Sequence, residues 1–385
     1  MDKLIPVTII TGFLGAGKTT LLNRILTEDH GEKIAVIENE FGEESIDNEL
    51  IVRSEDEEII TMNNGCICCT IRGDLVENLL TLVKKKQDGT ADFERIIIET
   101  TGVADPGPVA QTFFMDEQIS QMFMVDGIIT VVDALNGPTT LNEQPAAQAQ
   151  VGFADRILLS KVDLVEREEV EELSHRLRHM NPRAPIFEVN MGSVDIKQVL
   201  DIHGFNMDAV LDIDPDFLTP EKDEDECCCG HDHHDGECCC GHDHHDHHHD
   251  GECCCGHDHH DHHHHDGECC CGHDHGHHKH HHHKSYDDEI AAFIFKSDKP
   301  FDPARLDRYM QSLTQVYGPD MLRYKGVLYM TGTDRRMIFQ GVHMLMGADL
   351  GKPWGDDRPS SKIVFIGRKL PKDAIIQGLE TCLAE

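Results

Sequence analysis

The sequence is poor in basic residues and contains no long apolar run. Its 385 residues include 71 Asp and Glu but only 34 Lys and Arg, which gives a formal net charge of −37 with histidine neutral. A surplus of this sign argues against nucleic acid as a partner. No apolar run reaches the length of a membrane span, and residues 1–6 lack a basic region, an apolar signal core and a cleavage site. We therefore expect a cytoplasmic protein without a membrane partner.

Residues 223–284 contain no apolar side chain other than cysteine, so burial cannot offset the entropy of ordering this segment. The segment instead holds twelve of the 16 cysteines and 24 of the 29 histidines, in four tandem copies that each begin Cys-Cys-Cys-Gly-His-Asp-His. Thiolate and imidazole groups bind soft and borderline metal ions. Adjacent cysteines make a poor disulfide framework and are better interpreted as metal ligands in a reducing compartment. The internal, repeated composition therefore favours metal binding over an expression tag.

Sixteen acidic residues and two lysines give this tract a charge of about −14, which raises the local concentration of cations. The candidate ligands are the cysteine triplets and the first histidine: Cys227, Cys228, Cys229, His231, Cys238, Cys239, Cys240, Cys253, Cys254, Cys255, Cys269, Cys270 and Cys271. We expect the tract to act as a flexible, metal-laden linker. Its composition leaves open whether the metal is stored, sensed or transferred.

Residues 1–215 alternate short apolar runs with amphipathic segments. The predicted strands are 7–11, 34–38, 95–99, 127–132, 156–159 and 186–189, and the predicted helices are 18–27, 74–86, 146–151 and 167–180. Such alternation predicts an α/β fold with a mostly parallel sheet and helices on both faces. Ligands then bind beyond the carboxyl ends of the strands.

Regular patterns resume after the repeats. Strands are predicted at 291–295, 322–331, 336–346 and 362–366, and helices at 303–314 and 371–383. Residues 286–385 are therefore expected to form a smaller α+β domain.

Residues 12–19, Gly-Phe-Leu-Gly-Ala-Gly-Lys-Thr, match the phosphate-loop pattern Gly-x4-Gly-Lys-Ser/Thr without a mismatch. They follow an apolar strand and precede a helical pattern, which is the context that the motif requires. Backbone N–H groups and the helix N-terminus then surround the phosphates. Lys18 is expected to reach the β- and γ-phosphate oxygens, the Thr19 hydroxyl to bind Mg²⁺, and Thr20 to contact the α-phosphate. The predicted binding residues of the loop are Gly12, Gly15, Ala16, Gly17, Lys18, Thr19 and Thr20.

Two later segments complete the predicted nucleotide site. An apolar strand ends in Glu99, the position of a second Mg²⁺ contact, although a surface charge at the sheet end is the alternative. Gly102 can donate its N–H to a γ-phosphate. Residues 160–163, Ser-Lys-Val-Asp, are a near match to the Asn/Thr-Lys-x-Asp signature for guanine, in which Asp163 accepts from the base and Lys161 lies over it. GTP is therefore the predicted nucleotide, and the predicted catalytic residues are Lys18, Thr19 and Glu99.

A second metal site is predicted inside this domain, where residues 65–69 read Gly-Cys-Ile-Cys-Cys. The cysteines are Cys66, Cys68 and Cys69, and the carboxylates that follow the second predicted strand are Glu38, Glu40 and Glu43. Three thiolates so close in sequence cannot all face one metal without strain, so one or two ligands should come from elsewhere. A site shared by Cys68 and these carboxylates would couple metal geometry to nucleotide state. Small buried cysteines near a turn are the alternative.

Together these segments resemble the CobW-like branch of the CobW/HypB/UreG family of P-loop GTPases, of the zinc-regulated GTPase metalloprotein activator type. The matching segments are residues 11–20, 38–43, 65–69, 99–102, 104–108, 160–163, 322–326 and 339–342. The resemblance covers everything except the repeat tract. It implies a GTP-hydrolysing metallochaperone with slow intrinsic hydrolysis that a metal or a client protein stimulates. It also implies that Cys68, Glu38 and Glu43 form the internal metal site.

Composition and resemblance together divide the chain into three segments. The resemblance implies a P-loop GTPase domain with the internal metal site over 1–215 and a CobW C-terminal domain over 286–385, and the composition predicts disordered metal-binding repeats over 216–285. Two features depart from the family pattern. The guanine signature begins with Ser160 where Asn is usual, and the Cys-Cys-Cys repeats exceed simple His-rich loops.

Three functions remain open on the sequence. The favoured one is a GTPase that binds Zn²⁺ and transfers it to a client metalloprotein, with the repeats as a reservoir. A second is a GTPase that inserts Ni²⁺ or Co²⁺ into a metalloenzyme or a cofactor, although thiolate clusters favour Zn²⁺ or Cu(I). A third is a metal buffer with a vestigial GTPase, against which the intact Lys18, Thr19 and Glu99 argue. The predicted ligands are GTP, Mg²⁺ and Zn²⁺, with Co²⁺ or Ni²⁺ as alternatives, and a homo-oligomer is left open.

Overall fold

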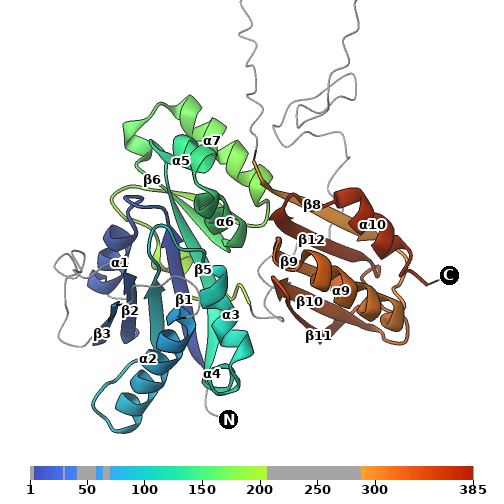
Figure 1. The fold of residues 1–385 in the computed structure, drawn as a ribbon, viewed down its shortest axis with the longest axis horizontal. Helices are drawn as coiled ribbons and strands as arrows, with labels where there is room; N and C mark the ends of the chain where they lie inside the picture. Colours follow the sequence, from blue (N-terminus) through green and yellow to red (C-terminus); the bar gives the residue numbers. More distant parts are fainter. Residues whose placement is uncertain (1–3, 29–30, 41–57, 64–69, 206–287, 385) are drawn as a thin grey trace, which may run out of the picture. The chain divides into compact units, whose positions relative to one another are not determined.

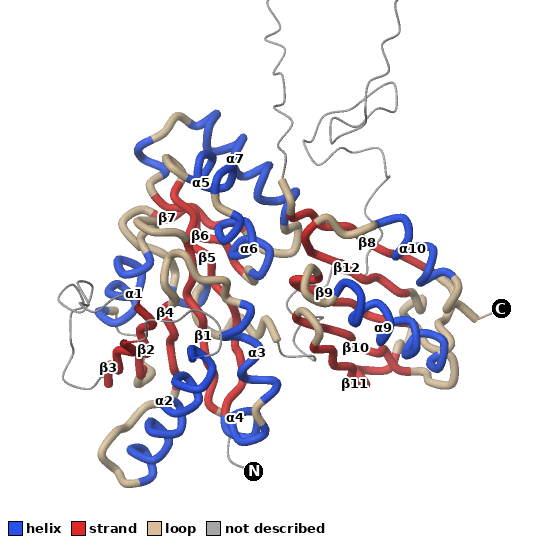
Figure 2. Tube along the Cα trace, in the orientation of Figure 1, coloured by secondary structure: helices blue, strands red, loops and turns tan. Residues whose placement is uncertain are grey.

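The computed structural model describes residues 4–28, 31–40, 58–63, 70–205 and 288–384, with backbone alone for 39–40, 58–63 and 70–72 (Figures 1 and 2). The described residues of the two halves form two sheets within a single compact unit. None of the described helices combines the length and the apolar composition that crossing a membrane requires.

The first sheet has seven strands in the order β3-β2-β4-β1-β5-β6-β7, and every pairing between them is parallel. The strands are β1 (Ile5–Gly12), β2 (Ile34–Glu40), β3 (Glu58–Asn63), β4 (Arg95–Glu99), β5 (Phe123–Asp133), β6 (Arg156–Ser160) and β7 (Ile186–Val189). Both faces are apolar: Ile96 and Ile98 pack into one core cluster and Ile97 into the other, because successive side chains of a strand point to opposite faces. The predicted α/β class is confirmed.

Among the described residues, seven α-helices accompany this sheet: α1 (Lys18–Thr27), α2 (Thr70–Gln87), α3 (Gly107–Met115), α4 (Glu117–Met122), α5 (Gly137–Glu143), α6 (Pro145–Phe153) and α7 (Arg167–Met180). Leu21, Leu22 and Ile25 of α1 cover one face of the sheet. Helices α2, α3, α6 and α7 contribute to the core on the other face. Local sequence fixes several helix ends. The Asp116 side chain accepts hydrogen bonds from two backbone N–H groups at the start of α4, and Glu166 forms a capping box with Glu169 at the start of α7.

The second sheet is antiparallel, in the order β11-β10-β9-β12-β8. Its elements are β8 (Ile290–Ser297), α9 (Pro303–Tyr317), β9 (Met321–Leu328), β10 (Arg335–Val342), β11 (Leu345–Pro353), β12 (Ser361–Arg368) and α10 (Lys372–Glu380). Helices α9 and α10 pack their apolar residues on one face of this sheet, in a cluster that includes Phe293, Leu313 and Phe365. The predicted α+β architecture is confirmed for this half.

The prediction of one strand over residues 336–346 is wrong. The chain turns at His343 and Met344, and β10 and β11 form a hairpin. His343 takes a positive φ of 52°, a conformation that glycine or asparagine more commonly adopts in turns. Neither His343 nor Met344 is a usual turn former, so the sequence carries no turn signal at these positions and the prediction ran through them as one strand.

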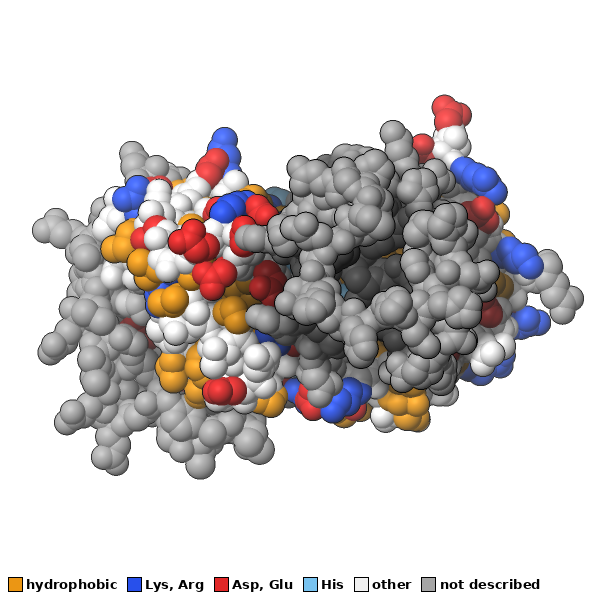
Figure 3. Space-filling model, turned by 90° about the horizontal axis from the view of Figure 1, so that it is seen from above, with side chains coloured by type: hydrophobic (Ala, Val, Ile, Leu, Met, Phe, Trp, Pro, Cys, Tyr) orange, Lys and Arg blue, Asp and Glu red, His pale blue; other side chains and the backbone are white. Residues whose placement is uncertain are grey.

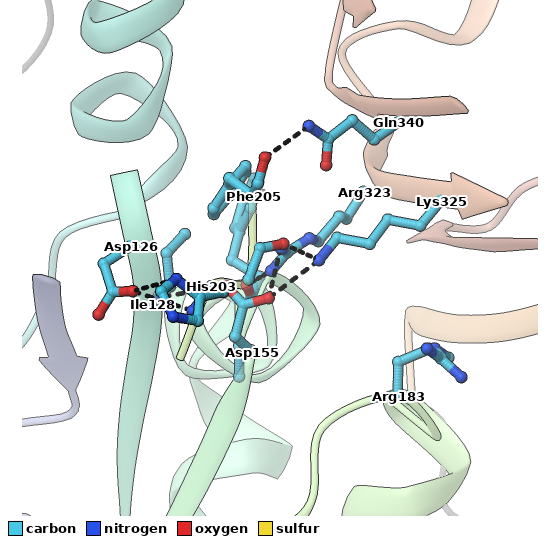
Figure 4. A network of polar contacts seen from close by, with 12 residues as sticks. Asp126, Ile128, Asp155, Arg183, His203, Phe205, Arg323, Lys325 and Gln340 are labelled. Atoms are coloured by element: carbon cyan, nitrogen blue, oxygen red, sulfur yellow. Dashed lines mark hydrogen bonds and ion pairs between the residues drawn. The ribbon is translucent and has the colours of Figure 1, made fainter. Parts of the chain in front are cut away.

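A buried polar network joins the two sheets at the beginning of β6 (Figure 4). The Asp155 carboxylate accepts from Arg323 and, at 3.1 Å, from Lys325, both on β9, and from the backbone N–H of Ile128 at 3.0 Å. Burial opposes ionisation of Asp155, but Arg323 and Lys325 outweigh it and lower the pKa of this carboxyl. Gln340 on β10 adds a hydrogen bond to the carbonyl of Phe205 at 3.0 Å. The contact between the sheets is therefore specified by charge as well as by packing.

The surface of the described residues is mixed in character on the face seen in Figure 3, where acidic side chains lie among apolar and basic ones. Removing the tract's charge of about −14 from the total of −37 leaves the remaining chain acidic as well.

Candidate functional site: a phosphate loop beside two buried carboxylates

The loop between β1 and α1 has the backbone geometry of a phosphate site. Gly12 ends β1 at a φ of 140°, and a Cβ atom on it would lie 2.3 Å from the carbonyl oxygen of Val131 on β5. Only glycine fits this approach. Gly17 precedes α1 in the left-handed region, at a φ of 104°, and Gly15 is also left-handed. The chain therefore curls into a loop that ends at the N-terminus of α1, where backbone N–H groups and the helix dipole favour an anion.

Lys18 and Thr19 lie in the first turn of α1. The side chain of Lys18 is largely buried, and its Nζ atom donates to the carbonyl of Phe13 within the loop at 3.3 Å. The Thr19 hydroxyl donates to Oε1 of Glu99 at 3.2 Å. Thr20 is exposed in the same turn. The structure thus brings together the three predicted catalytic residues, from α1 and from the carboxyl end of β4.

The hydroxyl of Thr19 and the carboxylate of Glu99 are hard oxygen donors, which is the ligand type that Mg²⁺ prefers. Their separation of 3.2 Å lets one ion, or a water bound to it, contact both groups. The donor set at this position therefore fits Mg²⁺.

Glu38 lies directly beside Glu99 in the sheet, since β2 and β4 pair in register at these two residues. Two residues earlier on each strand, Val36 and Ile97 pack in the core cluster that α1 covers, so Glu38 and Glu99 point to that same face. Glu38 is 2% exposed and Glu99 8%. Burying two neighbouring carboxylates is costly unless cations balance them. The structure thereby places a predicted ligand of the internal metal site next to a predicted Mg²⁺ ligand.

The segment after β4 returns to the phosphate loop. The N–H of Thr100 donates to the carbonyl of Ile10 at 2.9 Å, and its hydroxyl bonds that of Thr11 at 2.9 Å. A Cβ atom on Gly102 would lie 2.5 Å from the backbone nitrogen of Leu14. Gly102 therefore packs directly on the phosphate loop, where its predicted contact with a γ-phosphate requires it to be.

The predicted base-binding segment begins at the end of β6 and is also tied to the phosphate loop. Ser160 donates its hydroxyl to the carbonyl of Ala16 at 2.6 Å. Lys161 has a left-handed φ of 57°, and its Nζ atom pairs with Asp133 at 2.7 Å. Burial opposes ionisation of Asp133, but hydrogen bonds from Lys161 and Asn136 lower its pKa. Asp163 is exposed in the short 3₁₀ helix Val162–Leu164. The two residues predicted to bind the base, Lys161 and Asp163, thus both follow the carboxyl end of β6.

The remaining predicted metal ligands lie outside the described residues. These are Glu43, Cys66, Cys68, Cys69 and all the candidate ligands of the repeats, Cys227, Cys228, Cys229, His231, Cys238, Cys239, Cys240, Cys253, Cys254, Cys255, Cys269, Cys270 and Cys271. Among the residues that are described, no three His, Cys, Asp or Glu side chains come together in a group suited to a metal ion.

Two residues that contact the site were not predicted from the sequence. Asp133, at the end of β5, holds Lys161, and Gln150 on α6 donates to the carbonyls of Gly102 and Ala104 at 3.1 and 3.0 Å. For Asp133 the signal was present, because it directly follows an apolar strand at the carboxyl edge of the sheet. For Gln150 no local signal exists.

Comparison with known proteins identifies the family. The profile of the CobW/HypB/UreG nucleotide-binding domain matches residues 6–188, and that of the CobW C-terminal domain matches residues 290–383. The zinc chaperone YjiA of Escherichia coli is 37% identical over 373 residues, which cover 96% of each chain. The zinc chaperone CobW of Pseudomonas aeruginosa is 30% identical over 413 residues, which cover 99% of this chain and 92% of the relative.

The solved structures agree. The crystal structure of Zn(II)-bound YjiA GTPase from Escherichia coli superimposes with a TM-score of 0.70 at 31% identity, covering 99% of this chain and all of the other. Since the two profiles span both sheets and full-length relatives match nearly the whole chain, the resemblance predicted from the motifs is confirmed. The protein belongs to the CobW/HypB/UreG family, in the branch that carries a CobW C-terminal domain.

Proposed function

We propose that the protein is a GTP-hydrolysing metallochaperone that binds Zn²⁺ and transfers it to a client protein. The observation that carries this proposal is the pairing of Glu38 with Glu99 in register on β2 and β4. One carboxylate belongs to the predicted Mg²⁺ site and the other to the predicted cargo site. A shift of either strand end therefore changes both sites together.

The nucleotide chemistry is assigned to the phosphate loop and the groups around it. Lys18 binds the β- and γ-phosphate oxygens, while Thr19 and Glu99 hold the metal ion. Mg²⁺ held by these two residues would supply positive charge that offsets the negative charge developing during hydrolysis. Gly102 binds the γ-phosphate through its N–H, so the loss of this phosphate releases the segment after β4.

Guanine specificity is assigned to Asp163, with Lys161 over the base. The Lys161–Asp133 ion pair, at 2.7 Å, holds the stem of Lys161 at the rim of the site. Ser160, where the family signature usually has Asn, binds the carbonyl of Ala16, so its hydroxyl supports the phosphate loop. The segment is therefore tied to the phosphate loop without an Asn at this position.

Zinc as cargo is supported by the chemistry of the ligands and by the two relatives that are named zinc chaperones. The proposed internal site combines Glu38 and Glu43 with Cys68, and thiolate together with carboxylate suits Zn²⁺. The repeats supply further thiolates and imidazoles, which we assign as a reservoir that loads this site.

GTP turnover tests the proposal. Phosphate release would be measured on the full chain with Mg²⁺ and, in turn, with Zn²⁺, Co²⁺ or Ni²⁺. Zinc is expected to change the rate, and this effect is expected to be lost in Glu38→Gln. A rate that responds to Ni²⁺ or Co²⁺ but not to Zn²⁺ would assign a different cargo. No turnover under any condition would favour a metal buffer and would contradict the proposal.

A further inference from the structure

Helix α6 carries two buried glutamines that face different parts of the molecule. Seven of its nine residues, from Ala147 to Phe153, are buried, so only the first two residues of the helix reach the surface. Gln148 and Gln150 are two positions apart, which places their side chains about 200° apart around the helix axis. A side-chain amide is costly to bury unless its polar atoms find hydrogen-bond partners. The partners of these two residues therefore show what the helix connects.

Gln150 contacts the segment that follows the Mg²⁺ carboxylate. Its Nε2 atom donates to the carbonyls of Gly102 at 3.1 Å and of Ala104 at 3.0 Å, and the side chain is 1% exposed. The backbone carbonyl of Gln150 accepts a hydrogen bond from the Thr130 hydroxyl on β5 at 2.7 Å, which anchors this part of the helix to the sheet. A single amide group thus holds two carbonyls of one turn.

Gly102 also packs against the phosphate loop. The close approach of its Cα atom to the backbone of Leu14 leaves no room for a side chain. Gly102 is therefore held at its Cα atom by Leu14 and at its carbonyl oxygen by Gln150.

Gln148 contacts the beginning of the C-terminal domain. Its Oε1 atom accepts from the N–H groups of Glu289 at 3.0 Å and Ile290 at 3.3 Å, where β8 starts. Its Nε2 atom donates to the carbonyl of Leu141 at 2.8 Å. Further along the helix, Gly152 packs on Leu322 of β9 so closely that a Cβ atom would lie 2.7 Å from the leucine side chain.

We propose that Gln150 is a positioning residue for GTP binding and hydrolysis, and that α6 relays the position of Gly102 to the start of β8. The inference rests on the proposed function, in which the Gly102 N–H binds the γ-phosphate. When GTP is bound, Gly102 moves toward the phosphate and its carbonyl pulls on Gln150. Because seven of its nine residues are buried, α6 shifts as a rigid element, and Gln148 transmits that shift to the backbone of β8.

The first test separates positioning from general stability. In the full chain with Mg²⁺, affinities for GDP and for a non-hydrolysable GTP analogue would be measured for wild type and for Gln150→Met, which fills similar space but cannot donate. The variant is expected to lose about tenfold in affinity for the analogue relative to GDP, since the two hydrogen bonds that orient Gly102 are gone. Gln148→Met, a matched change on the other side of the helix, is expected to keep the wild-type ratio.

A merely structural role would lower both affinities of Gln150→Met equally, and this result would overturn the proposal. Failure of wild type to bind the analogue at all would instead contradict the proposed function. The two failures are therefore distinguishable.

The second test follows β8 and begins with the wild-type protein alone. Amide hydrogen exchange of the peptide that covers residues 288–297 would be compared between the GDP and GTP-analogue states of wild type. The account predicts a difference of severalfold in exchange rate at Glu289 and Ile290, and its loss in both Gln150→Met and Gln148→Met. Equal exchange in the two nucleotide states of wild type would overturn the relay.

Discussion

Lys18 is the residue whose charge the proposed reaction needs most directly. Lys18→Ala is expected to abolish GTP hydrolysis and to weaken GTP binding, because the β- and γ-phosphate oxygens lose their cationic partner. The zinc capacity of the repeats should not change. Phosphate release and a zinc titration would be measured on the same preparation. Lys33→Ala provides a control, since Lys33 is exposed at the surface, where its Nζ atom lies 2.6 Å from the Asp92 carboxylate. Wild-type turnover in Lys18→Ala would contradict the assignment.

Lys325 makes stability depend on pH at the contact between the two sheets. Burial and the neighbouring Arg323 lower the pKa of Lys325 from its ordinary value of 10.5 to about 7, against the attraction of Asp155. Between about pH 7 and 10.5 the unfolded chain therefore binds a proton at this residue that the folded protein does not bind. The free energy of unfolding should rise with pH across this window, by at most about 1.4 kcal/mol per pH unit. Below this window Lys325 is protonated in both states and should not contribute to the pH dependence of the unfolding free energy.

Lys325→Met removes the titrating group while keeping most of the side-chain volume. Denaturant unfolding of wild type and variant, with metal removed by a chelator, would be compared from pH 7.5 to 9.5. The difference in unfolding free energy is expected to shift in favour of wild type as the pH rises. Parallel curves for the two proteins would show that Lys325 titrates normally.

At the scale of elements, the strongest sequence patterns predicted their boundaries well. Helices α1 and α7 and strands β4 and β7 begin and end at the predicted residues. For three of these elements local features decide the outcome: the glycine loop before α1, the capping box of α7 and the continuous apolar run of β4. Strand β3 was not predicted, because its segment is preceded by acidic residues without a clear period. Helices α3, α4 and α5 are short and were also missed.

The candidate site was predictable where its residues are close in sequence. Lys18, Thr19 and Glu99 follow from motifs, but the pairing of Glu38 with Glu99 depends on which strands are neighbours, and β4 lies between β1 and β2. Gln150 is 48 residues from Gly102, and its partners are backbone carbonyls that carry no sequence signal. Tertiary contacts of this kind require the strand order and the packing of α6.

Helix α7 is held to the segment before β8 by a buried ion pair. Arg176 donates to Asp288 at 2.6 and 3.0 Å, and the two side chains are 1% and 5% exposed. Asp288→Ala is expected to lower the free energy of unfolding by about 3–5 kcal/mol, because it leaves a buried guanidinium without its carboxylate.

Chemical denaturation of Asp288→Ala would be compared with Asp298→Ala. Asp298 pairs with Arg358 at 2.7 Å, but both side chains are exposed, so little change is expected for this control. Equal effects of the two substitutions would show that the buried Arg176–Asp288 pair does not hold α7 to the segment before β8.

At the scale of the whole molecule, one chain carries a GTPase domain and the tract proposed to bind metal. Deletion of residues 223–284 should remove most of the bound zinc, about four ions if each repeat binds one and at most roughly nine by ligand count. Zinc binding by the full chain should weaken as the pH falls, because thiols and imidazoles must lose protons. Metal analysis after dialysis would measure both effects. A deleted chain that binds as much zinc as the full chain would contradict the role of the repeats.

The central claim is that nucleotide state and metal affinity are coupled through the neighbouring carboxylates Glu38 and Glu99. If Glu38, Glu43 and Cys68 hold one zinc ion, the GTP and GDP states must differ in zinc affinity. By linkage, zinc must then change nucleotide affinity by the same factor. An effective chaperone needs a coupling of about 1–3 kcal/mol, or roughly 5- to 150-fold.

The most direct test uses the chain without residues 223–284, so that only the internal site reports. Zinc affinity would be titrated by chelator competition with GDP and with a non-hydrolysable GTP analogue, in wild type, Cys68→Ala and Glu38→Gln. The account predicts a difference of at least about fivefold between the two nucleotide states. It also predicts weaker binding in both variants. Identical zinc affinities in the two states, or undiminished binding in Cys68→Ala, would contradict it.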